Sequence, residues 1–318
     1  MTKFAILGLG FMGKKHLDAI SQNPNAMVSA IIDEQPISIP DTKYFSCLDF
    51  FLAESTDTDV VIISTPNCQH FSEAKKLLEN GYNILLEKPY CLTTEEAEIL
   101  KDTAEKHKKN IFFSHQNRYS EISKFLKKIC DDALLGEIYF IQSNLFWNRG
   151  ENYYLPQSWK GKKAQDGGVL YTQFFHFIDL IIWLFGDIHI RSTMMKTLRN
   201  QTIVEIEDTG SFSFELMKGN GMGVVNFSTA VYEKNLESSM TILAENGTIK
   251  ISGQYFDNIE FCNIKNFDFK ELTQNNNLTN LSQMIDEICQ SHSQYPTTNL
   301  EENLQIVKRI EEIYTKTN

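Results

Sequence analysis

Apolar runs and amphipathic stretches alternate along the first third of the chain. Each run has the length of one strand, and the stretch after it carries apolar residues at helical spacing. Alternation of strand and helix is typical of a parallel, doubly wound sheet. We therefore predict an α/β domain of the Rossmann type for residues 1–117. Its strands are expected at residues 4–7, 27–32, 59–64, 83–86 and 111–113.

Three helices are predicted from local signals. In the one at about residues 93–107, Thr93 or Thr94 can cap the first turn, where two glutamates follow. Another is expected from about residue 120 to 130. The last, residues 299–315, has apolar residues at helical period and is expected to close a core.

Beyond residue 118 the apolar runs predict a different architecture. They suit a mixed or mostly antiparallel sheet in a second, α+β domain at residues 118–318. Asn246-Gly247 is a hairpin signal between the last two runs. The strands are expected at residues 138–147, 210–216, 222–228, 239–244 and 248–252.

The most apolar stretch, residues 166–186, predicts one buried helix that ends at Gly186. Its polar exceptions Thr172, His176 and Asp179 are spaced i, i+4 and i+7, which would place them on one stripe. A single histidine on an apolar helix is more often a satisfied core residue than a catalyst. Because a threonine, a glutamine and an aspartate accompany it here, we favour a functional role for His176.

Composition narrows the function. The chain has 318 residues, ample for two cores, and a formal net charge of −11, which argues against general nucleic-acid binding and against an anionic membrane surface. The six cysteines show no CxxC spacing, and the histidines form no HxxxH or HxH pair, so neither a metal site nor a metal-dependent hydrolase is favoured. Residues 1–3 run straight into a strand and no apolar run has membrane-spanning length, so we expect a cytoplasmic protein.

A glycine-rich loop lies between the first strand and the first helix, which is the context of a dinucleotide-binding fingerprint. We expect Gly8 to permit the tight turn and Gly10 to let the backbone approach a pyrophosphate. Gly13 would allow close packing of helix on strand, with the phosphates at the positive end of the helix. The loop reads Gly8-Leu9-Gly10-Phe11-Met12-Gly13.

Asp33 ends the second predicted strand, about 20 residues after the fingerprint, where the motif places a ribose-binding acid. A carboxylate there would accept hydrogen bonds from the ribose hydroxyls and repel a 2′-phosphate. With Glu34 next to it and no adjacent Arg or Lys, this position favours NAD over NADP.

Two further strands end in polar motifs that should lie on the same edge of the sheet as the glycine loop. One motif is Thr65-Pro66-Asn67 and the other is Glu87-Lys88-Pro89. Proline stops the strand and holds Lys88 at its carboxyl end, which is the ligand-binding edge of an open parallel sheet.

These motifs resemble the Gfo/Idh/MocA oxidoreductases, whose members pair a dinucleotide-binding domain with a larger sheet domain. The resemblance also includes His16 and His70, which follow the first two motifs. It implies that Lys88 is a catalytic residue touching substrate and cofactor, and that subunits assemble into homodimers or homotetramers through the exposed face of the second sheet. The cofactor contacts that it implies are Gly8, Gly10, Phe11, Met12, Gly13, Asp33, Thr65, Pro66, Asn67, His70, Glu87 and Lys88.

The same family places a glycine pair, then Asp or Asn, then a catalytic histidine on a helix. Gly167-Gly168 and His176 match this pattern, as does Asp179. Thr172 departs from it, because it carries no charge where Asp or Asn is usual, and Phe174 stands where glycine is common. His176 is therefore the candidate general base, while an acid role at Thr172 is in doubt.

Residues 147–161 look like the subgroup that acts on nucleotide-linked sugars, best known for oxidising UDP-N-acetylglucosaminuronate at C3. Arg149, Lys160, Lys162 and Lys163 form a basic, aromatic-rich loop suited to a uronate or a diphosphate, although a solvated lysine loop is an equal alternative. The substrate contacts predicted are Arg118, Tyr119, Arg149, Tyr154, Trp159, Lys160, Thr172, Gln173 and His176.

The leading hypothesis is an NAD-dependent dehydrogenase of a sugar or sugar nucleotide. Lys88 would orient the reacting hydroxyl and His176 would remove its proton. Two alternatives stay open: a dehydrogenase of a free sugar or inositol, which would not need the basic loop, and an NAD-binding regulator without catalysis.

Overall fold

The computed structural model describes residues 1–37, 39–54, 56–154, 158–199, 202, 204–268, 279–290 and 300–316. The chain forms two compact units. The first contains Met1–Tyr119 and Asn276–Val307, and the second contains Ser120–Asn275 and Lys308–Asn318. This division differs from the sequence-based one, which assigned all of residues 118–318 to the second domain, because a late segment returns to the first unit.

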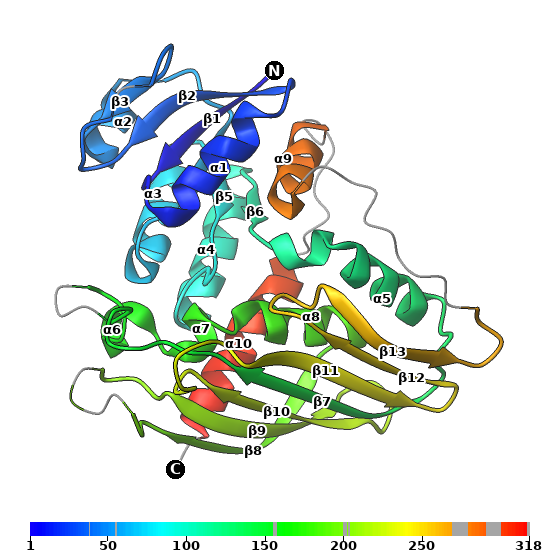
Figure 1. Cartoon of the computed structure of the whole chain (residues 1–318). Helices are drawn as coiled ribbons and strands as arrows, with labels where there is room; N and C mark the ends of the chain where they lie inside the picture. Colours follow the sequence, from blue (N-terminus) through cyan, green and yellow to red (C-terminus); the bar gives the residue numbers. More distant parts are fainter. Residues whose placement is uncertain are drawn as a thin grey trace. The chain divides into compact units, whose positions relative to one another are not determined.

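The first unit has a six-stranded parallel sheet in the order β3-β2-β1-β4-β5-β6 (Figure 1). The predicted doubly wound sheet is confirmed. The sequence pattern missed β3 and α2, which are too short to show a period. The elements are β1 (Thr2–Leu7), α1 (Phe11–Ser21), β2 (Ala26–Ile32), β3 (Lys43–Phe45), α2 (Leu48–Ala53), β4 (Val60–Ile63), α3 (His70–Glu79), β5 (Asn83–Leu86), α4 (Thr94–His107) and β6 (Ile111–Phe113).

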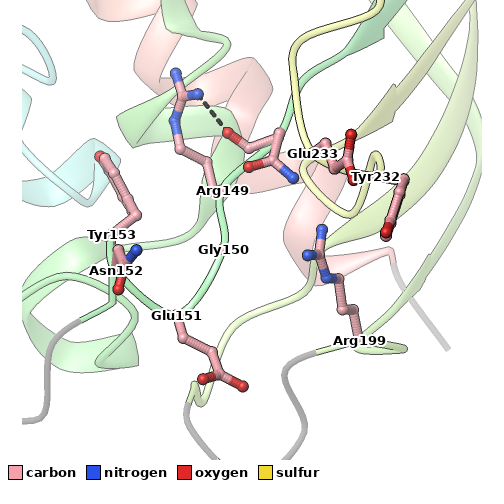
Figure 2. Close-up of a pocket in the computed structure, with 9 residues that line it drawn as sticks. Arg149, Gly150, Glu151, Asn152, Tyr153, Arg199, Tyr232 and Glu233 are labelled. Carbon is pink, nitrogen blue, oxygen red and sulfur yellow. Dashed lines mark hydrogen bonds between the residues drawn. The ribbon is translucent and has the colours of Figure 1, made fainter.

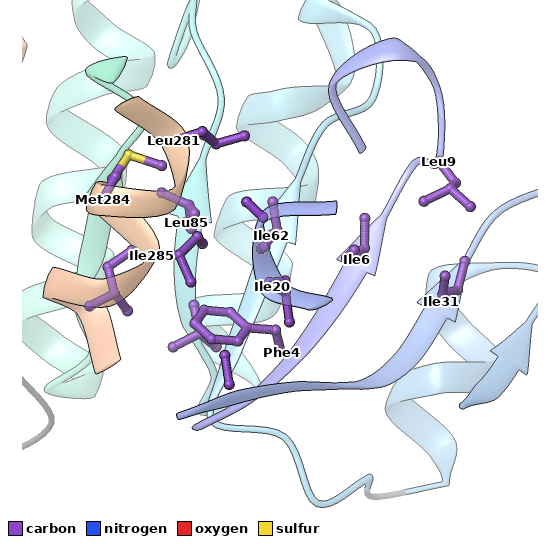
Figure 3. Packing of buried hydrophobic residues seen from close by; sticks show 14 residues of the cluster. Phe4, Ile6, Leu9, Ile20, Ile31, Ile62, Leu85, Leu281, Met284 and Ile285 are labelled. Carbon is purple, nitrogen blue, oxygen red and sulfur yellow. The ribbon is translucent and has the colours of Figure 1, made fainter. Parts of the chain in front are cut away.

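Helix α9 (Asn280–Gln290) completes the core of this unit. Its buried residues Leu281, Met284 and Ile285 pack in one cluster with Phe4 and Leu85 of the sheet (Figure 3). These apolar positions have helical spacing, so burial against the sheet is what stabilises a helix of this length. The sequence analysis did not predict α9.

The second unit has a seven-stranded sheet in the order β13-β12-β11-β7-β10-β9-β8. Neighbours pair antiparallel except β7 and β10, which are parallel, so the predicted mostly antiparallel sheet is confirmed. Strands β8 and β13 were not predicted. The strands are β7 (Ile138–Phe146), β8 (Ile188–Lys196), β9 (Thr209–Leu216), β10 (Met222–Ser228), β11 (Glu237–Ala244), β12 (Gly247–Ser252) and β13 (Asn258–Ile264).

The predicted hairpin between β11 and β12 is present, but its turn lies one residue earlier than expected. Ala244 pairs with Gly247, so Glu245-Asn246 form the two-residue loop and Gly247 begins the next strand. A β-carbon on Gly247 would lie 3.0 Å from Asn263 O on β13. Close approach of a third strand, not turn geometry, therefore explains this glycine.

Helices lie on one face of the second sheet (Figure 1). Helix α5 (Glu121–Asp131) begins where predicted, with the Ser120 hydroxyl accepting a hydrogen bond from Ser123 N. Trp147, just after β7, packs edge-on against Phe174 and Phe177 at 5.3 and 5.7 Å between ring centroids. The last helix, α10 (Leu300–Thr315), lies within the residues 299–315 for which a helix was predicted and ends where expected.

The single helix predicted for residues 166–186 is wrong. The structure has three helices instead: α6 (Lys163–Asp166), α7 (Val169–Thr172) and α8 (Phe175–Phe185). Gly167 and Gly168 have φ of 85° and 123°, which end α6, and Gly186 ends α8 as expected.

A second break follows α7, where the N–H of Phe174 bonds to Val169 O, five residues back, at 3.1 Å. The axes before and after this break differ by 50°. Thr172 and His176 therefore belong to different helices, and the single polar stripe does not form. Among the described residues, no single helix has both the length and the apolar composition to span a membrane, and α6–α7 with α8 meet that test only as this bent pair.

Candidate active site

The glycine loop has an open backbone at its centre. Gly8 has φ of +87° and donates its N–H to Ile32 O at 2.8 Å. A β-carbon on Gly13 would lie 2.1 Å from Gly8 O, whereas one on Gly10 would have nothing within 4 Å. No side chain caps the start of α1 at Phe11, so its first N–H groups are available to an anion. The loop therefore has the form of a phosphate cradle.

Asp33 stands at the carboxyl end of β2, next to this loop. Its Oδ2 accepts a hydrogen bond from Leu9 N at 2.6 Å and its Oδ1 accepts one from Gln35 N at 2.8 Å. Two backbone donors thus fix the direction of the carboxylate, and each oxygen retains capacity for a hydroxyl donor. Together with the open glycine backbone, this arrangement fits a dinucleotide that carries a free ribose diol.

The motif after β4 is held by two side chains of α3. His70 is 1% exposed, and its Nε2 lies 2.9 Å from Thr65 O. The Thr65 hydroxyl donates to Glu73 at 2.5 Å, and burial raises the pKa of Glu73 to about 7 against the effect of that bond. Asn67 is buried at the start of the short helical turn that follows Pro66.

Lys88 follows β5 and is half-buried between two fixed neighbours. Glu87 is 3% exposed and lies 2.7 Å from Nε2 of His16, on α1. Pro89 O lies 2.7 Å from Nδ1 of His70. Glu87 and His70 thus hold the turn around Lys88, and their predicted contacts with the cofactor stay a prediction.

In the second unit, Thr172 is tied to a buried acid that the sequence analysis did not single out. Asp166 is 1% exposed and accepts hydrogen bonds from the Thr172 hydroxyl and, at 2.8 Å, from Gly161 N. A carboxylate is therefore present beside Thr172, although residue 172 itself carries none. His176 lies in the first turn of α8 and is 6% exposed.

Gln173 connects this segment with the basic loop. Its Oε1 accepts from Arg149 Nε at 2.6 Å, and its Nε2 donates to the Tyr153 hydroxyl at 2.6 Å. The Arg149 guanidinium lies 4.8 Å from the Trp147 ring and 5.2 Å from the Tyr153 ring. Lys160 Nζ lies 4.1 Å from the Tyr153 ring centroid. We call Arg149, Tyr153, Lys160 and Gln173 the basic-aromatic cluster.

Arg149 and Tyr153 of the basic-aromatic cluster line an open groove of about 640 Å³, together with the acidic side chains of Glu151 and Glu233 (Figure 2). The sequence analysis missed three of its lining residues, Arg199, Tyr232 and Glu233, which come from distant parts of the chain. Arg199 donates from Nη1 to Val231 O at 2.8 Å. No local motif marks these residues, because only the fold of the sheet brings them to residues 148–153.

The other predicted substrate residues have varied surroundings. Arg118 is buried in the first unit and pairs with Glu302 at 2.6 Å. Tyr119 donates to Glu287 at 2.7 Å, and burial together with that acid raises its pKa far above the usual value. In the second unit Tyr154 is buried against Tyr153, with 5.0 Å between ring centroids, and Trp159 is partly exposed.

A buried carboxyl group supports the start of α7. Glu207 accepts hydrogen bonds from Val169 N at 2.8 Å and from the Tyr314 hydroxyl at 2.5 Å. Burial raises its pKa to about 7, the two bonds oppose that rise, and Asp166 adds to it. No local pattern indicates this contact, because Tyr314 lies on the last helix.

We expect Glu207→Gln to flatten the pH dependence of stability. The folded state binds the Glu207 proton more tightly than the unfolded state, so the free energy of unfolding falls as pH rises from about 4.5 to about 7. Glutamine can accept the same two hydrogen bonds without titrating. The wild type should lose roughly 2 kcal/mol more than the variant across this range, after a discount for partial exposure.

Urea unfolding at a series of pH values measures this difference, and the exposed Glu205→Gln is the matched control. Glu73 adds a similar slope to every variant, so only the difference between proteins is diagnostic. An unchanged slope in Glu207→Gln would show that Glu207 titrates normally.

The class of protein follows from the fold and from comparison with known families. Residues 2–115 match the model described as "Oxidoreductase family, NAD-binding Rossmann fold", and residues 124–250 match "GFO/IDH/MocA C-terminal domain". The protein is thus built as a dinucleotide-binding oxidoreductase with NAD as its cofactor. The chain belongs to the GFO/IDH/MocA oxidoreductase family.

Among solved structures, the WlbA dehydrogenase from Bordetella pertussis in complex with NADH and UDP-GlcNAcA is similar over 99% of this chain and 95% of that one. The TM-score is 0.88 and the sequence identity is 27%. Two curated relatives are more partial matches, and the chain spans about half the length of each.

One of these is the 2,7-anhydro-N-acetylneuraminate hydratase of Mediterraneibacter gnavus, 26% identical over 60% of this chain and 51% of the relative. The other is the glucose-6-phosphate 3-dehydrogenase of Bacillus subtilis, 28% identical over 58% of this chain and 54% of the relative. One relative is named a hydratase and the other a dehydrogenase. The chemistry of the site therefore has to distinguish between these two reactions.

Proposed function

We propose that this protein is an NAD-dependent dehydrogenase that oxidises a hydroxyl group of a nucleotide-linked uronic sugar, with UDP-N-acetylglucosaminuronate and its C3 hydroxyl as the leading candidate. The observation that carries this proposal is the basic-aromatic cluster. Arg149 and Lys160 both lie against the Tyr153 ring, in a chain whose formal net charge is −11. Two cations beside one half-buried ring suit an anionic ligand better than they suit the folded protein alone.

The charges within the basic-aromatic cluster also support an anionic substrate. Burial lowers the pKa of Lys160 and Arg149 lowers it further, while Asp166 raises it. The Arg149 guanidinium donates hydrogen bonds to Gln173, Asn148 O and Asn235. A carboxylate or phosphate of the substrate would accept charge-assisted hydrogen bonds from the two cations. The likeness to a dehydrogenase crystallised with UDP-GlcNAcA supports the same substrate class.

The catalytic roles follow from the residue chemistry. NAD, when bound, supplies the hydride acceptor, and Asp33 with the backbone of residues 8–13 would hold it. Lys88 donates a hydrogen bond to the reacting oxygen and stabilises its developing negative charge. His176 accepts the hydroxyl proton as general base. Gln173 keeps Arg149 in place through its hydrogen bond.

The decisive experiment follows NADH absorbance after NAD is added together with UDP-N-acetylglucosaminuronate, or with a panel of free sugars and inositols. A rise with the nucleotide sugar alone supports the proposal. Turnover of free polyols only would assign the enzyme to the alternative substrate class. Because one relative is named a hydratase, mass spectrometry of the sugar should accompany the assay, and a change of mass by one water without NADH would contradict dehydrogenation.

We expect Lys160→Met to raise KM for the nucleotide sugar by about tenfold, the effect of losing one charge-assisted hydrogen bond. Lys162→Met is the matched control, because Lys162 is exposed in the same loop and lies outside the cluster. Steady-state kinetics at saturating NAD measures both variants. Equal KM values in the two variants would leave the basic-aromatic cluster without a role in substrate binding.

A further inference from the structure

The end of β4 forms one wall of the glycine loop. The Ser64 hydroxyl donates a hydrogen bond to Gly8 O at 2.7 Å. A β-carbon on Gly8 would lie 2.9 Å from the methyl carbon of Thr65, so the Thr65 side chain also lies against the backbone of the loop. The orientation of Thr65 therefore helps to set the shape of the phosphate cradle.

Glu73 fixes that orientation. It stands in the first turn of α3, and its Oε2 accepts the hydrogen bond from the Thr65 hydroxyl at 2.5 Å. Threonine is branched at its β-carbon, so the direction of its hydroxyl group also sets the direction of its methyl group. The peptide of Thr65 is held from the same helix, because His70 Nε2 lies 2.9 Å from Thr65 O. One residue thus connects the Glu73 carboxyl group with the glycine loop.

The Glu73 carboxyl group titrates in an unusual range for an acid. Burial raises its pKa to about 7, and the bond from Thr65 opposes that rise. The two lysines that follow on α3 pair with other acids, Lys75 with Glu79 and Lys76 with Asp49. Both ionisation states of Glu73 are therefore populated near neutral pH.

Two titratable neighbours of Glu73 are neutral near pH 7. Burial raises the pKa of the Cys68 thiol, in the short helical turn after Pro66, and the charge of Glu73 adds to that rise. Burial lowers the pKa of His70, on which Glu87 and Lys88 act in opposite directions. Helix α4, which packs against α3, has the uncharged buried side chains Ala97, Leu100, Thr103 and Ala104. An ionised Glu73 therefore places a negative charge close to a loop that has the form of an anion site.

We propose that Glu73 is a positioning residue for NAD that acts through Thr65 and takes up a proton when the cofactor binds. The neutral carboxyl group can still bond to the Thr65 hydroxyl, but it no longer repels the pyrophosphate. NAD affinity then decreases as pH rises above about 7, because ionisation of Glu73 opposes binding. This inference goes beyond the proposed function, since it concerns the cofactor and holds for any sugar substrate.

Calorimetric NAD titrations from pH 6 to pH 9 test the uptake of the proton. A nearby anion should raise the pKa of Glu73 by about one unit, so the NAD affinity of the wild type should fall close to tenfold, roughly, over this range. Glu73→Gln resembles the neutral acid. It should match the wild type at pH 6 and bind NAD about tenfold more tightly than the wild type at pH 9. Glu79→Gln, which changes an exposed acid of the same helix, is the matched control and should keep the wild-type profile.

A purely structural role of Glu73 predicts a different result. Glu73→Gln would then change NAD affinity by the same factor at every pH. Because other groups also titrate between pH 6 and pH 9, only the difference between the proteins is diagnostic. A pH profile of Glu73→Gln that is parallel to the wild type would overturn the proposal.

Glu73→Ala separates position from charge. Alanine cannot accept the hydrogen bond from Thr65, so this variant should bind NAD about three- to tenfold more weakly than Glu73→Gln at every pH, the usual effect of losing one hydrogen bond. Its pH profile should be as flat as that of Glu73→Gln. Equal NAD affinities in the two variants would overturn the action through Thr65.

The wild type alone provides a second measurement, in case the variants do not fold. NAD titrations at pH 7.5 in buffers of different ionisation enthalpy count the protons that binding takes up, and we expect about half a proton per NAD. Binding without proton uptake would overturn the proposal. All these titrations omit the sugar, so failure of the proposed substrate and failure of this inference are distinguishable.

Discussion

Replacing His176 with alanine is expected to lower kcat for the nucleotide sugar by about a hundred- to ten-thousandfold, the usual contribution of a positioned general base. The side chain is 6% exposed at the start of α8. Its loss leaves the hydroxyl proton to be taken by solvent. NAD affinity should not change, because His176 belongs to the second unit and the predicted cofactor contacts belong to the first.

Steady-state kinetics and an NAD titration of the same preparation check this prediction. His189→Ala is the matched control, because it removes an exposed histidine from β8 of the same unit. The control should keep the kcat of the wild type. Full activity in His176→Ala would exclude this residue as the general base. The Thr172–Asp166 pair would then be the candidate proton acceptor.

The parallel sheet could be predicted because buried strands between two layers of helices must be continuously apolar. β1, β4 and β5 are each mostly apolar. Because these strands are parallel, the glycine loop after β1 and Lys88 after β5 lie on the same edge of the sheet. β3 has three residues and cannot show a period. α9 has a clear apolar face, yet it lies far along the chain from the sheet that it covers, and sequence order does not reveal such a return.

In the second unit, the prediction of one continuous helix for residues 166–186 was wrong because the local composition gave no indication of the breaks. Residues 166–186 are so apolar that helix period and burial looked continuous, but two glycines and a bend after Thr172 divide them. The physical reason lies in long-range contacts. Glu207 and Tyr314 bind the backbone at the start of α7, so the loop before it is stabilised by residues that no local pattern connects.

Alanine substitutions at two glycines of the dinucleotide loop should distinguish effects on stability from effects on NAD affinity. We expect Gly13→Ala to lower both stability and NAD affinity. A β-carbon there would lie 2.1 Å from Gly8 O, so α1 must move away from β1, at a cost of roughly 1–3 kcal/mol, as in other overpacked sites. Thermal unfolding and calorimetric NAD titration measure the two effects. A variant as stable as the wild type would show that Gly13 does not set the distance between helix and strand.

Gly10→Ala is the counterpart, because its β-carbon would meet nothing within 4 Å. Stability should therefore fall less than in Gly13→Ala, because no atom of the folded protein blocks the new methyl group. NAD affinity should fall at least about tenfold, because the methyl group occupies the surface where the pyrophosphate approaches the backbone. If the folded variant binds NAD as tightly as the wild type, the phosphates must bind elsewhere, because the added methyl group would block their approach to the backbone of the glycine loop.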